Sequence, residues 1–481
     1  DNDIEDITPL ESLAELEDLN VRGNYIEDIS VLAHLSALED VNLRYNYIKD
    51  IQALSGLGKL TKRVYLEGNP VVDFEPLAAR FDQIEEKDFT LEPAAPVFSV
   101  AGGLYEEAQT IEITSKYEDA DIYYTLDGSE PTKESLLYTG PITVASREGD
   151  EPVVSMISTS KNTYLGTYGG KSNMINWIKP DPEDVFMGTV IRAKVFRENG
   201  EESDTITHSY FVDENMKERY TLPIISIATN AENFFSDEQG IYVPGNDFDG
   251  DGRSSGNYQN RGEEWERPIH LEFFDTDGGK GFSLDAGARV YGHASSSLPQ
   301  KSLRIYAREE YGQSYINYPV FKDVDLKQYK RLNLRNSGND WVDTLFRDAF
   351  NQKLMENTKL DIQHSRPAIV FINGEYFGIF NIREANNEHT FEDRYGTDSD
   401  NIDLLEKDYL VNAGDWQAYD KLIKFIEDHD LSEPEHYETV KSMIDEDNLI
   451  DYLASQIYIG NADWPHNNIR YWRYKTEFDP E

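Results

Sequence analysis

Apolar residues in the first part of the chain recur at a spacing that fits neither an α-helix nor an alternating strand. Leu and Val follow one another at steps of three and two, and each run ends in an asparagine. These asparagines, Asn2, Asn24, Asn46 and Asn69, are spaced by 22, 22 and 23 residues, and Ile or Val stands two residues after each. Each repeat is expected to form a short strand and a turn whose unpaired backbone groups the asparagine bonds. The pattern predicts a repeat solenoid over residues 1–90.

The next segment, residues 91–216, has the alternation of an all-β domain. Strand-like runs cover residues 109–114, 120–126, 190–196 and 205–212. The Asp127-Gly128 pair directly after one of these runs is a hairpin signal. We expect an immunoglobulin-like β-sandwich, interrupted at about 146–187 by an insertion rich in Ser, Gly, Asn and Tyr. The insertion's Tyr164, Tyr168 and Trp177 have the chemistry to stack on a sugar, but packing of the insertion on a neighbouring domain is favoured.

Residues 217–481 combine two patterns. Up to about Phe380 the runs are strand-like with one helix at 343–355. After Asp415 the apolar residues return at helical spacing, as at Tyr419, Leu422, Ile423 and Ile426. A β-rich half followed by a helical half predicts two lobes with a ligand cleft between them. The whole chain is therefore expected to be a multidomain α+β protein.

Charge and composition exclude several classes of partner. The 481 residues include 45 Lys+Arg and 91 Asp+Glu, a net charge of −46, which argues against nucleic acid and anionic membranes as partners. The sequence has no apolar run of about 18 residues that would span a membrane. The absence of cysteine excludes disulfides and thiolate metal sites, and it fits an exported bacterial protein as well as a cytosolic one. A start at Asp1, without Met or an apolar leader, favours a mature or excised fragment.

A motif near the C-terminus carries the clearest candidate chemistry. Asp463 follows an amphipathic segment, and Asn468 comes five residues later. Protein kinases use this spacing in their catalytic loop, where the Asp accepts the proton of the substrate hydroxyl and the Asn binds a metal bridging the phosphates. The spacing alone often arises by chance, so its context decides. Between Asp463 and Asn468, Trp464 is expected to hold the loop in place by packing, and His466 is expected to support the loop.

That context is a set of separated sequence blocks from about Leu222 onward. They cover residues 222–227, 256–258, 263–268, 287–292, 298–303, 347–349 and 373–384. Together with the Asp463 loop they resemble the CotH kinase family, named for bacterial spore-coat proteins. The resemblance implies an atypical protein kinase that uses ATP with Mg²⁺ or Mn²⁺. Its activity would be transfer of the γ-phosphate to Ser or Thr of surface or extracellular-matrix proteins.

The resemblance also implies nucleotide-binding roles. Lys301 lies in the block where CotH proteins carry their nucleotide-facing lysine, although a solvated strand lysine is the ordinary explanation of such a residue. Asp348 on the predicted helix is expected to hold Lys301, with Asp343 as the alternative. Glu384 is expected to bind the ribose hydroxyls or, alternatively, to form a surface pair with Arg383.

One feature departs from the family pattern. CotH relatives carry a second acidic metal ligand on a strand some twenty-odd residues beyond the catalytic loop. The acids after the loop in this chain, Glu477, Asp479 and Glu481, lie too close to Asn468 to fill that role. We therefore expect that the segment with this ligand is missing from the chain and that residues 1–481 bind ATP poorly.

A separate acidic run resembles the first half of a calcium loop. Asp247, Asp249 and Asp251 alternate before Gly252 at the sixth position, but Tyr258 stands at the twelfth, where a bidentate Glu is usual. A calcium site and a solvated acidic turn are equally consistent with this sequence.

Two further resemblances concern the first half of the chain. The repeats resemble internalin-type leucine-rich repeats, and the phrase at 123–132 resembles the C-terminal domain of chitobiases. They imply a secreted or cell-surface protein with a glycan or protein ligand, although the repeats serve equally as a spacer. The alternative function is a non-catalytic scaffold, adhesion or carbohydrate-binding protein with a CotH fold.

Overall fold

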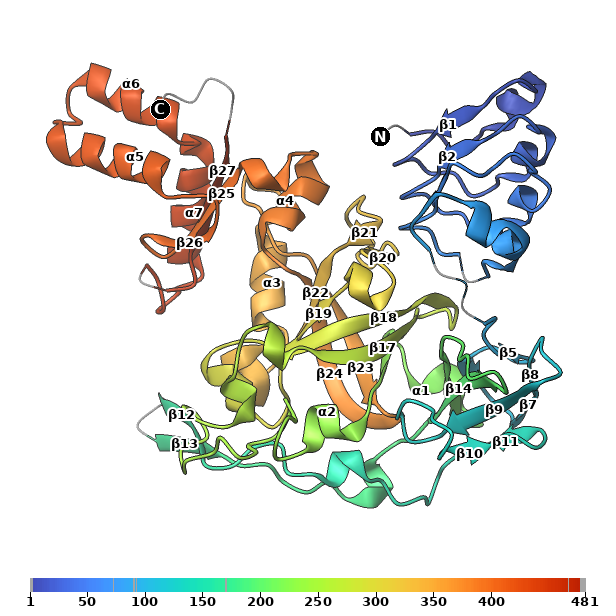
Figure 1. The fold of residues 1–481 in the computed structure, drawn as a ribbon. Coiled ribbons are helices and arrows are strands. Elements are labelled where there is room, and N and C mark those ends of the chain that lie inside the picture. The colour runs from blue at the N-terminus through green and yellow to red at the C-terminus, as the bar shows by residue number, and fades with distance from the viewer. Residues whose placement is uncertain are drawn as a thin grey trace.

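Four regions follow one another along the chain (Figure 1). The computed structural model describes residues 3–71, 73–89, 91, 93–168, 171–465 and 467–475, without the side chains of residues 82, 164–168 and 171–174. A repeat region and a β-sandwich are followed by a central β-barrel. The fourth region, which is mainly helical, extends from the barrel on the side away from the sandwich.

The repeat region stacks four short parallel strands into one sheet. The strands are β1 (Asp18–Asn20), β2 (Asp40–Asn42), β3 (Arg63–Tyr65) and β4 (Glu86–Lys87), and the 3₁₀ helices are η1 (Thr8–Ser12), η2 (Ser30–His34), η3 (Gln52–Leu54) and η4 (Glu75–Gln83). The side chain of Asn46 accepts a hydrogen bond from the Ile26 amide at 3.1 Å and donates to the Leu43 and Val21 carbonyls. The asparagines thus bond the backbone of adjacent repeats as predicted; Asn2 lies outside the described residues.

The β-sandwich has a five-stranded sheet in the order β10-β9-β14-β15-β6, with two-stranded pairs β11-β7 and β5-β8 beside it. Its strands are β5 (Val97–Phe98), β6 (Gly103–Tyr105), β7 (Gln109–Ile111), β8 (Ile113–Thr114), β9 (Ala120–Thr125), β10 (Leu136–Leu137), β11 (Ile142–Val144), β14 (Thr189–Arg197) and β15 (Ile206–Val212). A hairpin does follow at Asp127-Gly128, because β9 pairs antiparallel with β10, but its loop covers residues 126–135 and is longer than a two-residue turn.

The insertion leaves the sandwich and runs beneath the barrel to the opposite side (Figure 1). It contains η5 (Val154–Met156), β12 (Thr163–Tyr168), β13 (Lys171–Ile175) and η6 (Pro182–Asp184). The buried carboxylate of Glu375 accepts hydrogen bonds from the amides of Val153, Val154 and Ser155 at 2.7, 3.1 and 2.8 Å. Packing on the neighbouring domain is therefore confirmed, and the side chains of Tyr164 and Tyr168 lie outside the described residues.

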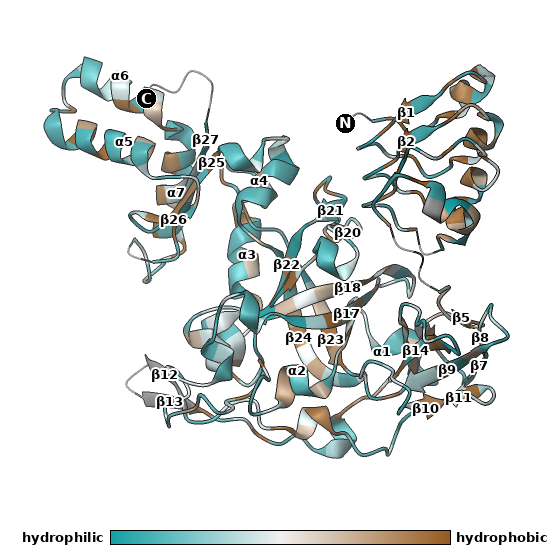
Figure 2. Ribbon diagram, viewed as in Figure 1, coloured by the Kyte–Doolittle hydropathy of each residue, from teal (hydrophilic) through white to brown (hydrophobic). Residues whose placement is uncertain are grey.

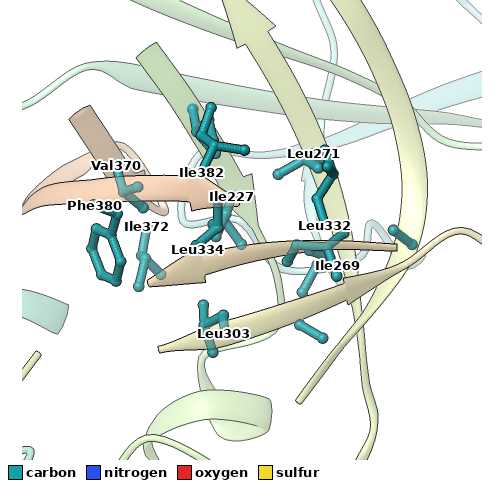
Figure 3. Close-up of a cluster of buried hydrophobic side chains, with 14 of the residues drawn as sticks. Ile227, Ile269, Leu271, Leu303, Leu332, Leu334, Val370, Ile372, Phe380 and Ile382 are labelled. Carbon is teal, nitrogen blue, oxygen red and sulfur yellow. The ribbon is translucent and has the colours of Figure 1, made fainter. Parts of the chain in front are cut away.

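The β-rich lobe is a closed seven-stranded barrel in the order β16-β17-β18-β19-β22-β24-β23. Its strands are β16 (Ile224–Ala228), β17 (Arg267–Phe274), β18 (Lys280–Val290), β19 (Leu303–Tyr306), β22 (Arg331–Arg335), β23 (Ser365–Ile372) and β24 (Glu375–Glu384). Alternating apolar residues point inward, among them Leu303, Leu334, Ile372 and Phe380 (Figure 3). Polar residues on the same strands therefore face outward.

Shorter elements decorate the barrel. They are α1 (Met216–Arg219), α2 (Ala231–Phe235), η7 (Asn257–Gln259), η8 (Glu263–Trp265), η9 (Ala294–Ser297), η10 (Glu309–Tyr311), β20 (Ile316–Asn317), β21 (Gln328–Tyr329), η11 (Gly338–Val342) and α3 (Arg347–Leu354). The predicted helix at 343–355 is thus α3, shorter at both ends.

The last region joins a three-stranded sheet to four α-helices. It comprises α4 (Glu388–Tyr395), η12 (Ser399–Asn401), β25 (Ile402–Glu406), β26 (Leu410–Ala413), α5 (Gln417–Asp428), α6 (Pro434–Met443), α7 (Glu446–Tyr458) and β27 (Arg470–Tyr474). The helices form where the periodicity predicts them, but many of their apolar side chains stay exposed, as Ile457 does at 71%. Figure 2 shows apolar residues on the barrel strands, whereas α5 and α6 are largely hydrophilic. Within the described ranges, no helix combines the length and the apolar character needed to cross a membrane.

Candidate functional site

A broad cleft of about 3250 Å³ separates the outer face of the barrel from the helical region. Strands β19 and β22 and helix α3 supply its first wall, which includes Arg304, Asn333, Arg335 and Asp348. Strands β25 and β27 and helices α5 to α7 supply the second. The predicted division into a β-rich half and a helical half thus produces a cleft, with residues from both halves along it.

The Asp463 loop lies on the second wall, directly after α7. The Asp463 carboxylate accepts hydrogen bonds through Oδ2 from the side-chain amides of Asn468 at 2.7 Å and Asn467 at 3.0 Å. Asn468 has a φ of 56°, and this left-handed turn returns its side chain toward Asp463. The five-residue spacing therefore brings the two predicted residues into contact. The two asparagine amide groups hold the exposed Asp463 carboxylate in one orientation at the cleft, as a general base requires.

The loop offers only part of a metal site. The amide oxygen of Asn468 is a hard ligand of the kind Mg²⁺ accepts, but Mg²⁺ in nucleotide sites usually takes a carboxylate as well. In the described part of the chain, no group of three His, Cys, Asp or Glu residues is arranged to hold a metal ion. Asn468 alone therefore does not make a magnesium site. His466 lies outside the described residues.

The structure corrects the assignment of Lys301 as the phosphate-binding cation. Lys301 is fully buried, and its ammonium nitrogen donates to the Leu298 carbonyl at 2.8 Å. The ring of Tyr258 lies 3.9 Å from that nitrogen, and the ring of Tyr242 lies 5.7 Å away. Burial lowers the pKa of Lys301 well below its ordinary value. The residue precedes β19 and points into the core, where it supports the 298–301 turn and does not reach the cleft.

Asp348 holds a different cation from the one predicted. Its Oδ2 lies 2.9 Å from Nη1 of Arg383 on β24 and 3.9 Å from Nη1 of Arg335 on β22. A helix carboxylate therefore does pair with a cation of the β-rich lobe, but that cation is arginine. The alternative, Asp343, contacts Arg347 at 3.2 Å on the same short segment.

Glu384 is also not available to a ribose, which corrects its predicted role. Its carboxylate is buried, accepts hydrogen bonds from the His364 amide at 2.8 Å and from the His364 ring, and pairs with Arg394. Burial opposes ionisation, but the hydrogen bond from His364 and the charge of Arg394 outweigh it and lower the pKa of Glu384. The residue ties the end of β24 to α4, and the alternative pair with Arg383 does not form either.

The acidic run at Asp247, Asp249 and Asp251 does not form a calcium loop. Each carboxylate is used locally: Asp247 accepts from Asn260, Asp249 from the Asp251 amide, and Asp251 from Arg253 and Ser254. Hydrogen bonds from the Ser255 hydroxyl and the Asp251 amide lower the pKa of Asp249. Among the described residues, which include all three, no group of three carboxylates is arranged to hold a metal ion, so the structure does not support the predicted calcium site.

The sequence reasoning missed the arginines of the barrel wall. Arg304 on β19 and Arg335 on β22 line the cleft, and Arg383 lies behind them on β24. The signal was present, because each alternates with buried Leu or Ile residues and so must face outward.

Comparison with known proteins identifies two domains in the chain. The family described as CotH kinase protein matches residues 288–478, and the chitobiase/beta-hexosaminidase C-terminal domain matches residues 100–149. An endoglucanase of Clostridium saccharobutylicum is 46% identical over 46 residues, which are 10% of this chain and 10% of that protein. The chain thus spans about a tenth of this relative's length.

Two solved internalin structures of Listeria monocytogenes also match, each over 19% of this chain. Internalin C2 is 34% identical with a TM-score of 0.17 and 38% of its chain covered, and the internalin inlF is 24% identical with a TM-score of 0.15 and 40% covered. The chain therefore contains a CotH kinase-like domain and a chitobiase-type domain, and it spans less than half of either internalin.

Proposed function

We propose that the cleft is the active site of an atypical, ATP-dependent protein kinase that phosphorylates Ser or Thr. The observation that supports the proposal most directly is the contact of Asp463 with Asn468 at the cleft, inside a match to the CotH kinase family. An anionic γ-phosphate also suits a cleft whose opposite wall carries Arg304 and Arg335.

In the proposed reaction the substrate hydroxyl oxygen attacks the γ-phosphorus, and the bond between the γ-phosphorus and the bridging oxygen of ADP breaks. The hydroxyl proton passes to the Asp463 carboxylate. Asn467 and Asn468 donate to Oδ2 of that carboxylate and so fix its direction. A bound Mg²⁺ or Mn²⁺ would neutralise phosphate charge, with the Asn468 amide oxygen as the one ligand assigned in this chain.

Replacement of Asp463 by Asn tests the proposal. Loss of a positioned base should lower transfer of labelled phosphate from ATP to a mixture of surface proteins by about 10²–10⁴-fold. Asp428→Asn, which removes an exposed acid at the end of α5, is the matched control and should keep full activity. Equal transfer by the Asp463 variant and the parent chain would refute the role of Asp463.

The second candidate is a non-catalytic scaffold with the same fold. The incomplete metal ligand set favours it, since Asn468 has no carboxylate partner for Mg²⁺ among the described residues. Absence of transfer with either Mg²⁺ or Mn²⁺, in a protein that still binds a surface protein or a glycan array, would support the scaffold.

We also propose a secreted or cell-surface location, with substrates on the bacterial cell or spore surface. The chitobiase-type match at residues 100–149 supports an extracellular module, and the repeats supply a further surface for a glycan or protein ligand. Protease treatment of intact cells should degrade the protein, whereas protection until lysis would contradict this location.

A further inference from the structure

The outer face of the barrel carries a row of arginine guanidinium groups. Neighbouring side chains pair with only some of their N–H donors. Arg304 on β19 is the cross-strand neighbour of Asn333 on β22, which is in turn the neighbour of Arg383 on β24. Cross-strand neighbours project to the same face of a sheet, so these side chains stand side by side. Arg335 lies two residues beyond Asn333 on β22 and shares that face.

Arg383 has the least ordinary environment of the three. The residue is 1% exposed, and its Nη1 atom lies 2.9 Å from the Asp348 carboxylate. Its Nε and Nη2 atoms are buried and have no hydrogen-bond partner among the described residues. Buried charged donors are costly to leave unpaired, so an acceptor is expected at this position.

Arg304 and Arg335 face the cleft with much of their donor capacity unused. The Nε of Arg304 donates to Asn333 at 2.9 Å, and its guanidinium lies 5.0 Å from the Tyr291 ring. In the described part of the chain, no carboxylate lies within 4 Å of Arg304, and the one nearest to Arg335 is Asp348 at 3.9 Å.

A shared neighbour shows that these groups form one electrostatic cluster. Burial raises the pKa of the Tyr291 hydroxyl, and the charges of Arg335, Arg304 and Arg383 oppose that rise. Among the described residues, the carboxylate that pairs with Arg335 and Arg383 is that of Asp348, so the three guanidinium groups are not balanced by acids there. A local excess of positive charge stands out in a chain of net charge −46.

We propose that Arg304, Arg335 and Arg383 form a binding site for a polyphosphate chain, in place of the lysine expected from the family. Planar guanidinium groups bind phosphate oxygens through paired N–H donors, which suits a row of them on a rigid sheet. The site rests on the proposed function only for the identity of its natural ligand, a nucleoside triphosphate. A free inorganic polyphosphate would present the same phosphate oxygens to these arginines.

Calorimetric titration distinguishes these sources with three probes: sodium tripolyphosphate, ATP and adenosine, each with and without Mg²⁺. The site predicts that tripolyphosphate and ATP bind, in contrast to the poor ATP binding expected from the sequence, and that adenosine binds far more weakly. ATP much tighter than tripolyphosphate identifies a nucleotide site, and equal affinities identify a polyphosphate site. Binding should also weaken as salt is raised, because the contacts are ionic.

Arg304→Gln and Arg335→Gln are the deciding variants, since both side chains are only half-buried. Each should weaken tripolyphosphate binding by about 10- to 100-fold, the effect of losing a charged hydrogen bond. Arg331→Gln is the matched control: it removes the same charge from the same strand, but Arg331 pairs with Glu388 and does not line the cleft. Its effect should stay below about 5-fold.

Arg383 is tested as Arg383→Lys, with the melting temperature measured first because the site is buried. A folded variant should bind tripolyphosphate at least about 10-fold more weakly, since lysine lacks the fork of donors. If Arg383→Lys does not fold, the tripolyphosphate affinities of Arg304→Gln and Arg335→Gln decide whether the site exists.

The outcomes separate this site from the proposed activity. Asp463→Asn should leave tripolyphosphate binding unchanged; arginine-dependent binding without phosphate transfer keeps the site and refutes the kinase. Wild-type protein that fails to bind tripolyphosphate, or binding that is indifferent to Arg304 and Arg335, overturns the site even if transfer is observed.

Discussion

The two walls of the cleft differ in how they are held in place. The barrel wall is one face of a closed sheet, with side chains such as Leu303 and Leu334 fully buried behind it. The helical wall has little core of its own: no residue of α5 is buried, and Ile450 and Ile457 are more than half exposed. Side chains on the barrel wall are therefore fixed by many contacts, whereas those on the helical wall depend on a few.

The contacts that connect the helical wall to the rest are specific. Trp472 on β27 stacks on Phe391 of α4 at 4.2 Å and donates to Asp361 at 2.8 Å. The start of α7 is tied to the loop after α3, where Asn448 donates to the Lys359 carbonyl and Asp451 accepts from the Lys359 amide. In the proposed kinase, the barrel would position the phosphates, and these joints would set the distance to Asp463.

The largest expected effect comes from opening a hole behind the barrel wall. Phe380 is fully buried in the core (Figure 3), and Phe380→Ala should lower the free energy of unfolding by about 3–5 kcal/mol. Its neighbour on the opposite face of β24, Ile379, is partly exposed, so Ile379→Ala is the control. Urea denaturation measures both, and a loss below about 1 kcal/mol for Phe380→Ala would contradict a packed barrel.

The next effect concerns the joint between the walls. Glu384→Gln leaves Arg394 without its buried carboxylate and should lower the free energy of unfolding by about 3 kcal/mol near neutral pH. The pKa of Glu384 is lowered on folding from its ordinary 4.5. The contribution of the carboxylate is therefore complete above pH 4.5 and is lost as the pH falls through the lower folded value.

Urea denaturation of wild type and Glu384→Gln at several pH values gives this difference. It should shrink as the solution is acidified below pH 4.5. The variant Glu388→Gln, at a half-buried residue that pairs with Arg331 at 3.8 Å, serves as control, with an expected cost of at most about 1 kcal/mol. A difference for Glu384→Gln that stays constant down to acid pH would show that the charge is not what stabilises the joint.

A much smaller effect is expected on the helical wall. Ile457 is 71% exposed, so Ile457→Ser should change the free energy of unfolding by no more than about 0.5 kcal/mol. The same urea experiment measures it. A loss above about 2 kcal/mol would mean that Ile457 is covered in solution and that the two walls are held alike.

The smallest effect is expected from calcium. Because no group of three carboxylates among the described residues is arranged to hold a metal ion, the melting temperature should be the same in millimolar calcium as with a chelator. Asp249→Asn should behave in the same way as wild type. A calcium-dependent rise that this variant removes would restore the calcium loop.

The sequence predicted the individual elements better than their joint geometry. The repeat period predicted the backbone-bonding role of the asparagines, and the helical spacing after Asp415 predicted the positions of α5 to α7. The contact of Asp463 with Asn468 follows from five residues of one loop, which is why a local motif anticipated it. Its catalytic role remains a prediction.

The failed assignments share a physical cause. Lys301 and Arg304 are three residues apart, but the first turns into an aromatic cage and the second faces the cleft. Which of two neighbouring cations meets a ligand depends on where β19 begins and on what packs against it. Glu384 is expected from the sequence to bind the ribose hydroxyls, but the fold buries it against His364 and Arg394, which lie 20 and 10 positions away in the sequence.

By itself, the sequence determined the repeat unit, the alternation that makes strands, and the presence of a kinase-like loop, because these depend on local spacing and backbone bonding. Only the tertiary structure decided that the β-rich lobe closes into a barrel, that Lys301 is buried, and that arginines from separate strands share one face of the barrel, two of them next to Asp348. Burial and charge pairing depend on neighbours brought together from distant parts of the chain, and a local pattern carries no information about those neighbours.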